Sequence, residues 1–162
     1  VADPYAGAGP AFPLLLAEAG LISGMLAGDL NPSAVELLEA NLERWTMKRD
    51  APLAPAEVVC EDARAWKNQD RLCGRAHALL VNLPHDSFEH LPDLFPVFDR
   101  SNTSLLRGWA IVERDSLPGR TDRLKRLVAS AGGTASETHV SEIKGFSTTR
   151  CFVVFQTTIT WD

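Results

Sequence analysis

A glycine-rich stretch near the start of the chain, "DPYAGAGP" at residues 3–10, has residue types suited to holding a nucleoside. Gly7 and Gly9 let the backbone approach a ligand closely, and the N-terminus of a following helix favours partial negative charge. Asp3, just ahead of the turn, would repel phosphate groups at close range, yet it suits a cationic sulfonium and an amino group. The stretch therefore fits S-adenosylmethionine better than a cofactor that contains a pyrophosphate.

The third glycine of a dinucleotide-binding GxGxxG motif is missing from this stretch. In that motif the third glycine allows close helix packing where the pyrophosphate lies. Phe12 stands at its position and would crowd the approach. This argues against NAD, although a glycine turn that holds no ligand stays open when the motif is judged alone.

Three further polar residues follow apolar runs that read as strands. Asp29 can accept two hydrogen bonds from ribose hydroxyls, unless it merely precedes the helix cap at Asn31. Asp62, or the backbone of Ala63, can meet the adenine amino group, unless Asp62 is only a solvated strand end. Asn82 can present its amide to a substrate base. Because ligands bind at the carboxyl ends of parallel strands, these positions together indicate one site.

The elements that must position these residues alternate between β-like runs and helical patterns. We predict parallel strands at 1–3, 22–30, 57–62, 77–84 and 108–114. We predict helices at 10–20, 31–45, 86–99 and 119–131, a short helix or turn at 64–73 and a proline-rich loop at 50–56. The runs 135–143 and 150–160 have no helix between them and should pair antiparallel at the sheet edge.

The predicted fold class is α/β, a Rossmann-like class I S-adenosylmethionine-dependent methyltransferase fold. Its sheet should be mostly parallel and seven-stranded, with a C-terminal antiparallel hairpin. The length of 162 residues suits a single domain over 1–162.

Several segments resemble the tRNA guanine-N1 methyltransferases that modify the purine beside the anticodon. The segments are "DPYAGAGPAFPLLLAEAG", "GDLNPSAVELLEANLERW", "CEDAR", "VNLP" and the tail "IKGFSTTRCFVVFQ". They are equally similar to the sister wybutosine-pathway enzymes, which transfer an aminocarboxypropyl group from the same cofactor. Tyr5 stands where the family usually has Phe, and His85-Asp86 is not a usual sequel to "NLP".

The resemblance implies S-adenosylmethionine as cofactor and assigns roles to particular residues. The turn from Tyr5 to Gly9 would cradle the methionine part, Asp29 would hold the ribose, and Asp62 with Ala63 would hold the adenine. Asn82 would contact the target guanine and is the expected catalytic residue. The expected cofactor-binding residues are Asp3, Tyr5, Ala6, Gly7, Gly9, Asp29, Leu30, Asn31, Asp62, Ala63 and Asn82.

The resemblance also implies groups that this chain does not carry. Guanine N1 bears a proton that a base must remove, and Asn82 cannot act as that base. The family places an Arg, a Glu and a tRNA-gripping domain before its first strand, whereas this chain begins at Val1. We therefore expect the base and the main tRNA-binding region upstream, and little methylation by this fragment alone.

Composition and charge limit the classes of protein to which the chain can belong. A chain that is 45% hydrophobic and 23% charged, without a long apolar tract, suits a soluble protein with no membrane partner. The net charge of -5 argues against a nucleic-acid binder over its whole surface, yet residues 100–150 carry nine Lys or Arg against five Asp or Glu. That region is either a solvated surface or an edge that faces tRNA.

The remaining expectations concern cysteines, metals and alternative functions. Cys60, Cys73 and Cys151 form no CxxC pair, so we expect reduced thiols, with Cys60 and Cys151 in the core. We expect no metal site and a monomer in the cytoplasm, with nucleus and mitochondrion open. A non-catalytic binding module stays open, as does a Rossmann oxidoreductase, which Phe12 and the terminal hairpin oppose.

Overall fold

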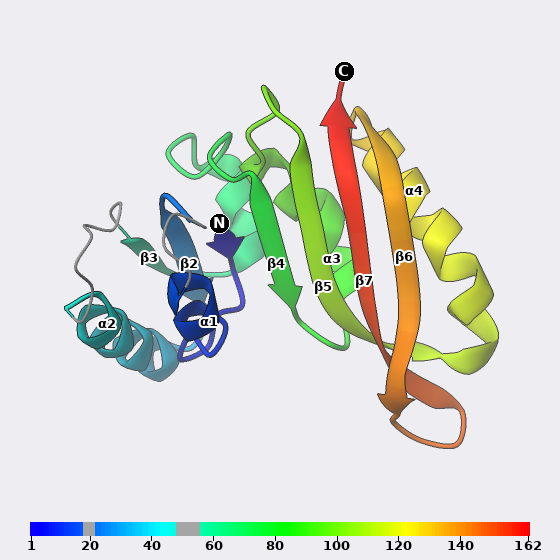
Figure 1. Cartoon of the computed structure of the whole chain (residues 1–162), viewed down its shortest axis with the longest axis horizontal. Helices are drawn as coiled ribbons and strands as arrows, with labels where there is room; N and C mark the ends of the chain where they lie inside the picture. The colour runs from blue at the N-terminus through cyan, green and yellow to red at the C-terminus, as the bar shows by residue number, and fades with distance from the viewer. Residues whose placement is uncertain (18–21, 48–55) are drawn as a thin grey trace.

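A seven-stranded mixed sheet forms the centre of the computed structural model, which describes residues 1–17, 22–47 and 56–162 (Figure 1). The strands are β1 (Ala2–Asp3), β2 (Met25–Asp29), β3 (Ala56–Cys60), β4 (Ala78–Asn82), β5 (Ser104–Glu113), β6 (Gly133–Gly145) and β7 (Arg150–Trp161). Their order is β3-β2-β1-β4-β5-β7-β6. The first five strands pair in parallel, and β7 pairs antiparallel with both β5 and β6. The predicted fold class and its antiparallel C-terminal pair are confirmed.

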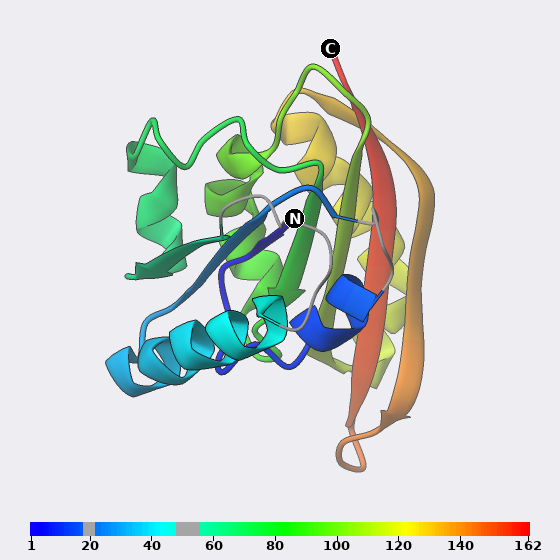
Figure 2. The same ribbon diagram turned by 60° about the vertical axis from the view of Figure 1, so that its left-hand side comes forward.

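Helices cover the two faces of the sheet at different ends. They are α1 (Phe12–Ala17), α2 (Pro32–Thr46), α3 (Ser87–Leu94) and α4 (Arg120–Ser130), with short 3₁₀ turns η1 (Ala63–Asn68), η2 (Phe95–Val97) and η3 (Arg114–Gly119). Figure 1 shows α1 and α2 on the near face, beside β1 to β3, and α3 and α4 behind the other half. The rotated view of Figure 2 shows α4 running along one side of β6 and β7. No helix in the described ranges is long and apolar enough to cross a membrane.

Two apolar cores follow from this division. Alternate residues of a strand point to opposite faces, so Met25 and Ala27 of β2 face α1 and α2 and share one apolar core with the buried Leu38. Leu26 points the other way, into the larger core under α3 and α4, which includes the buried Phe155. The helices thereby fix the carboxyl ends of the central strands on both sides.

Several boundaries differ from the prediction. β5 begins at Ser104 rather than at residue 108, because its first residues already pair with β4 and β7. The helical region 86–99 divides into α3 and η2. The predicted end of the first helix at Gly20 and most of the loop 50–56 lie outside the described residues.

The predicted core position of Cys60 is wrong, whereas that of Cys151 is confirmed. Cys60 ends the edge strand β3, and its side chain lies on the strand's exposed positions. A Val-Val-Cys run does not show which side of an edge strand is covered, so its apolar character was misleading.

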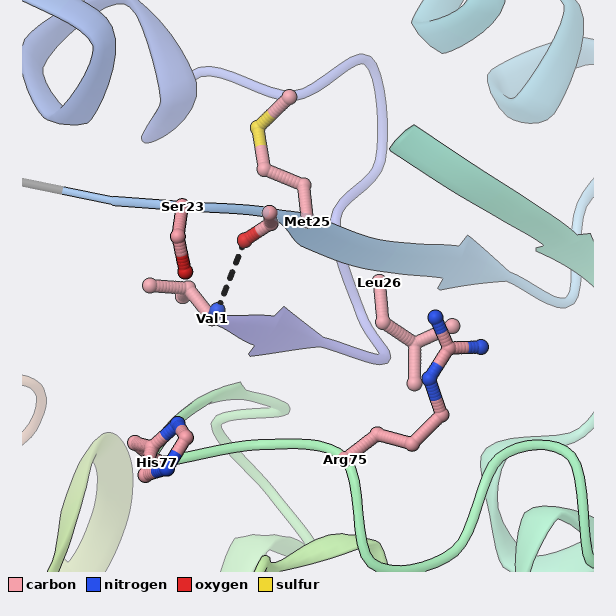
Figure 3. A pocket seen from close by; sticks show the side chains of 7 residues that line it. Val1, Ser23, Met25, Leu26, Arg75 and His77 are labelled. Atoms are coloured by element: carbon pink, nitrogen blue, oxygen red, sulfur yellow. Dashed lines mark hydrogen bonds between the residues drawn. The ribbon is translucent and has the colours of Figure 1, made fainter. Parts of the chain in front are cut away.

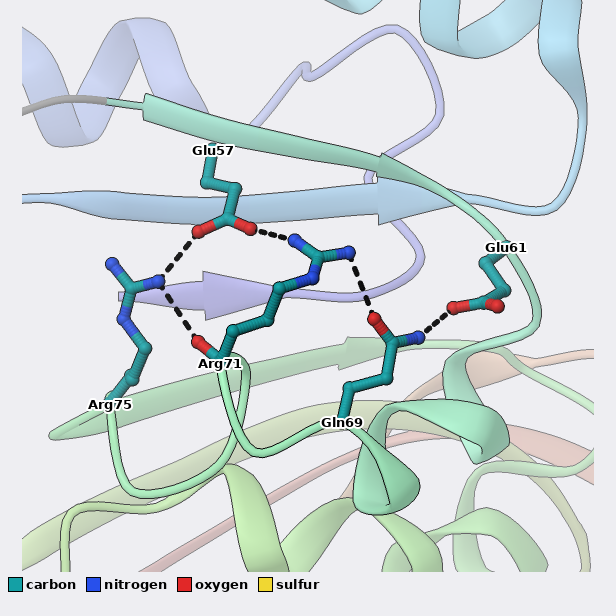
Figure 4. A network of polar contacts seen from close by, with 5 residues as sticks. All are labelled: Glu57, Glu61, Gln69, Arg71 and Arg75. Carbon is teal, nitrogen blue, oxygen red and sulfur yellow. Dashed lines mark hydrogen bonds and ion pairs between the residues drawn. The ribbon is translucent and has the colours of Figure 1, made fainter.

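A polar network anchors the segment after η1 to β3 (Figure 4). Glu57 of β3 forms ion pairs with Arg71 and Arg75, and Gln69 hydrogen-bonds both Arg71 and Glu61. Exposed ion pairs contribute little singly, but a connected set restrains the chain it joins. The network holds η1 near the end of β3, where the predicted site begins.

Candidate functional site

Asp29 joins the glycine-rich turn to the end of β2. Its Oδ2 accepts a hydrogen bond from the backbone N–H of Gly7 at 3.0 Å, and its Oδ1 accepts one from the N–H of Asn31 at 2.9 Å. The N–H of Ala6 also donates to the carbonyl of Gly28 at 2.8 Å. Each carboxylate oxygen can accept a further hydrogen bond, so Asp29 can still accept hydrogen bonds from ribose hydroxyls while it holds the turn in place.

Gly9 shapes the turn through its conformation and its packing. Its φ of 83° is in the left-handed region, and a Cβ there would lie 2.6 Å from Leu38 Cδ1 and 3.1 Å from Phe12 Cδ2. Gly9 lines neither of the cavities described below. It lets α1 and α2 close against the turn, which is a supporting role for a residue we predicted to contact cofactor.

We expect Gly9→Ala to lower the free energy of unfolding by about 2–4 kcal/mol, from backbone strain plus overpacking against Leu38. Gly74→Ala is the matched control, because Gly74 has φ 68° with open space around it. That variant should lose only about 1 kcal/mol. Urea unfolding of both variants measures the difference, and equal losses would contradict the packing role of Gly9.

A cleft of about 260 Å³ lies at the carboxyl ends of β1 to β4. We call it the Asp29 cleft. Its lining residues are Pro4, Tyr5, Asp29, Leu30, Asp62, Ala63, Arg64, Asn82, Leu83 and His90. Six of the predicted site residues therefore meet in one cleft, as the parallel strands require.

At one end of the cleft Arg64 binds both carboxylate oxygens of Asp62, with Nη2 at 2.6 Å from Oδ2. The Asp62 carboxylate also accepts the backbone N–H of Arg64. These hydrogen bonds from Arg64 lower the pKa of Asp62 to about 2. Since the carboxylate is already engaged, the backbone beside Ala63 is the freer group for an adenine.

Tyr5 and His90 face each other across the same cleft. The Tyr5 hydroxyl lies 2.7 Å from His90 Nδ1, and their ring centroids are 5.9 Å apart. Burial is the largest cause that raises the pKa of Tyr5, so it stays a neutral hydroxyl. His90 comes from α3, and no sequence pattern distinguishes it from the other histidines.

A second cavity of about 160 Å³ shares Asn82 with the Asp29 cleft. We call it the Asn82 cavity. Its lining residues are Asp3, Ala6, Pro10, Ala11, Leu80, Asn82, Trp109 and Phe152. Asp3 is 4% exposed, and its burial raises its pKa to about 7, against the lowering effect of the hydrogen bond from the Tyr5 N–H.

Two predicted residues besides Gly9 line neither cavity. Gly7 adopts φ 55° and donates to Asp29, and Asn31 caps α2 by accepting the N–H of Ser33 at 3.0 Å. Both support Asp29 rather than form the walls. The roles assigned to the lining residues stay predictions.

The structure adds lining residues that sequence reasoning missed. They are Pro4, Arg64, Leu83 and His90 in the Asp29 cleft, and Pro10, Ala11, Leu80, Trp109 and Phe152 in the Asn82 cavity. Trp109 is opposite Asn82 in the parallel β4–β5 register, so a correct strand alignment would have found it. Arg64 and His90 carry no comparable signal.

A further cavity of about 190 Å³ lies beside the starts of β1 and β2 (Figure 3). It is lined by Val1, Ser23, Gly24, Met25, Leu26, Arg75 and His77, and the Val1 nitrogen donates to the Gly24 carbonyl at 2.9 Å. None of the predicted site residues lines it. Ligands in sheets of this kind bind at the other ends of the strands, so we do not assign the function there.

No protein-family model and no curated protein matches the chain. Solved structures do match it. TYW2 from M. jannaschii in complex with AdoMet has a TM-score of 0.77 and 18% identity, over 99% of this chain and 68% of that chain. Trm5b from Pyrococcus abyssi has a TM-score of 0.74 and 17% identity, over 99% of this chain and 44% of that chain.

A complex of aTrm5 with tRNALeu matches with a TM-score of 0.67 and 16% identity, over 97% of this chain and 40% of that chain. The chain thus spans about two thirds of the TYW2 chain and less than half of these two Trm5 chains. Strand order, glycine turn and structural neighbours agree, and the chain has the fold of the class I S-adenosylmethionine-dependent methyltransferases.

Proposed function

We propose that this chain binds S-adenosylmethionine and transfers its methyl group to a tRNA base, N1 of the guanine beside the anticodon being the first candidate. The observation that carries the proposal is the meeting of the Asp29 cleft and the Asn82 cavity at Asn82. The Asp29 cleft offers the Asp29 carboxylate, which suits ribose hydroxyls. The Asn82 cavity is lined by the aromatic side chains of Trp109 and Phe152. Such a pair can hold a donor and an acceptor on either side of one residue.

The residues present fit this cofactor chemically. Asp29 fixes the turn and keeps free acceptor sites for a diol, and Leu30 beside it offers an apolar surface that is 69% exposed. Asp3 is a carboxylate whose ionised form would be stabilised by a cationic ligand in the Asn82 cavity. When bound, S-adenosylmethionine would supply an electrophilic carbon next to its sulfonium.

The protein's contribution to such a transfer is mainly positioning. Displacement at a carbon needs nucleophile, carbon and leaving group in line, and holding reactants in that geometry supplies much of the rate. Asn82 ends β4, and its amide offers both a donor and an acceptor to a base edge. The proton on guanine N1 still requires a base, and Asn82 is not one.

Transfer of an aminocarboxypropyl group from the same cofactor is the second candidate. The likeness to TYW2, bound to AdoMet in its solved structure, favours it as much as the Trm5 likenesses favour methyl transfer. The two reactions differ in which carbon beside sulfur faces the nucleophile. A label on either group therefore separates them.

The test uses protein expressed from its complete gene, tRNA transcripts with guanine or adenine beside the anticodon, and cofactor labelled in either the methyl or the aminocarboxypropyl group. We expect the methyl label to enter only the guanine transcript. Asn82→Ala should lower that transfer at least about 100-fold, because a positioning contact is lost. Label from the other group would favour the second candidate, and no transfer despite cofactor binding would favour a binding module.

A further inference from the structure

Two half-buried side chains from distant parts of the chain form part of the wall of the Asp29 cleft. Tyr5 follows β1, and its ring packs against the larger apolar core. His90 lies in α3, whose buried Phe88 and Leu91 belong to the same core. Both rings line the cleft, so the fold places a phenol and an imidazole beside the proposed cofactor site.

A short hydrogen bond joins these two side chains. The Tyr5 hydroxyl oxygen lies 2.7 Å from His90 Nδ1, a typical length for a hydrogen bond that a hydroxyl donates. Burial is the largest cause that raises the pKa of Tyr5, and the Asp62 carboxylate raises it further, so the phenol keeps its proton. A neutral imidazole that accepts this proton at Nδ1 carries its own proton on Nε2.

The second ring nitrogen of His90, Nε2, is left for a ligand. Within the described ranges of the chain, His90 forms a hydrogen bond to Tyr5 alone and takes part in no ion pair. Two carboxylates near the pair are bound by cations instead, Asp62 by Arg64 and Asp93 by Lys67, each at 2.6 Å. The pair therefore offers the cleft an N–H donor that no described protein group uses.

The part of the cleft near Asp62 needs such a donor. The Asp62 carboxylate already accepts hydrogen bonds from Arg64 through both oxygens, which leaves the backbone beside Ala63 for one edge of an adenine. Adenine has three ring nitrogens that accept hydrogen bonds, N1, N3 and N7. An imidazole N–H on the wall is complementary to any one of them, whereas a carboxylate would repel them.

We propose that His90 is a specificity-determining residue of the Asp29 cleft, whose Nε2 donates a hydrogen bond to a ring nitrogen of the adenine. Tyr5 acts through His90 and is a positioning residue, because its hydroxyl selects the tautomer and fixes the imidazole ring. The pair distinguishes adenine from a base that lacks this nitrogen. The inference rests on the proposed function, because it takes the Asp29 cleft as the cofactor site.

The experiment uses calorimetry on protein expressed from its complete gene. The ligands are S-adenosylhomocysteine, the demethylated product, and its 1-deaza, 3-deaza and 7-deaza analogues, each of which replaces one ring nitrogen by carbon. We expect one analogue to bind the wild-type protein about 3- to 10-fold more weakly than the parent, the range for one neutral hydrogen bond. His90→Phe should weaken the parent by the same factor and bind parent and analogue equally, because both ligands then lack the contact.

Two further variants test the geometry of the pair. His90→Gln should restore part of the discrimination, because its amide N–H can replace the Nε2 donor. Tyr5→Phe should reduce the discrimination, since the ring of His90 can then rotate and adopt either tautomer. A merely structural role would not change the ratio of two ligand affinities. Full discrimination in Tyr5→Phe would overturn the positioning role of Tyr5.

His139→Phe is the matched control, because His139 is exposed on β6 and lines neither the Asp29 cleft nor the Asn82 cavity. It should bind every ligand like the wild-type protein, and circular dichroism shows whether each variant is folded. Discrimination that His90→Phe abolishes and the control retains supports the inference. Parent binding with the same affinity ratios in wild type and His90→Phe overturns the inference and leaves the proposed function standing. Binding of none of these ligands by the wild-type protein overturns both.

Discussion

Asp29→Ala should weaken binding of S-adenosylmethionine by at least about 100-fold. A carboxylate that accepts two ribose hydroxyls forms charge-assisted hydrogen bonds of about 1.5–3 kcal/mol each, and alanine removes both. The substitution also frees the backbone N–H groups of Gly7 and Asn31, which now donate to Asp29. The cofactor site therefore loses a ligand contact and the restraint on its turn together.

Calorimetric titration of the wild-type protein and the variant measures this loss. Asp70→Ala is the control, since Asp70 is an exposed carboxylate away from the cleft. Asp29→Asn should retain part of the affinity because its amide oxygen can still accept one of the backbone hydrogen bonds. An Asp29→Ala variant that folds normally and binds the cofactor as tightly as the control would show that the ribose is held elsewhere.

Asp3→Asn should stabilise the protein at high pH and change it little at low pH. Burial raises the pKa of Asp3 from 3.8 to about 7. Between these values the folded state binds more protons than the unfolded state, so stability falls as pH rises and stays lowered above pH 7. The difference between the two pKa values corresponds to a loss of at most about 4 kcal/mol in the free energy of unfolding at high pH. Asparagine avoids this loss because it carries no charge.

Urea unfolding at pH 4 and pH 8.5 tests the sign of this effect. We expect a gain of about 2–4 kcal/mol for Asp3→Asn at pH 8.5 and almost none at pH 4. Asparagine can keep the hydrogen bond from the Tyr5 N–H, so the turn should persist. Equal gains at both pH values would mean that ionisation of Asp3 is not the cause.

The same variant should bind S-adenosylmethionine more weakly at pH 8.5, because the cofactor's cationic groups lose an ionised partner in the Asn82 cavity. Greater stability with weaker ligand binding is the pattern expected when a buried charge is kept for function. Asp70→Asn, an exposed carboxylate change, should alter neither property.

The sequence predicted the sheet and much of the site because strand ends are local features. An apolar run followed by Asp or Asn shows where a parallel strand stops, and parallel strands bring those ends to one edge. Asp29, Asp62 and Asn82 lie around one cleft for that reason. The antiparallel pairing of the two C-terminal strands was equally predictable from the sequence, since no helix separates them.

Residues that reach the site from other elements could not be predicted in this way. His90 approaches Tyr5 because α3 packs with one particular face against η1 and β5, and Phe152 enters through the register of β7. Arg64 ends the segment "CEDAR", but its hydrogen bonds to Asp62 depend on the geometry of η1. These placements depend on tertiary packing, which short-range patterns do not encode.

The central claim is that the cleft between Asp29 and Asn82 holds S-adenosylmethionine, and calorimetric titration of the wild-type protein tests it most directly. The account predicts saturable binding of S-adenosylmethionine and its demethylated product with a Kd of about 1 μM, equivalent to about -8 kcal/mol, and no binding of NAD. Absence of binding by both sulfur nucleosides, or binding of NAD with equal affinity, would contradict it.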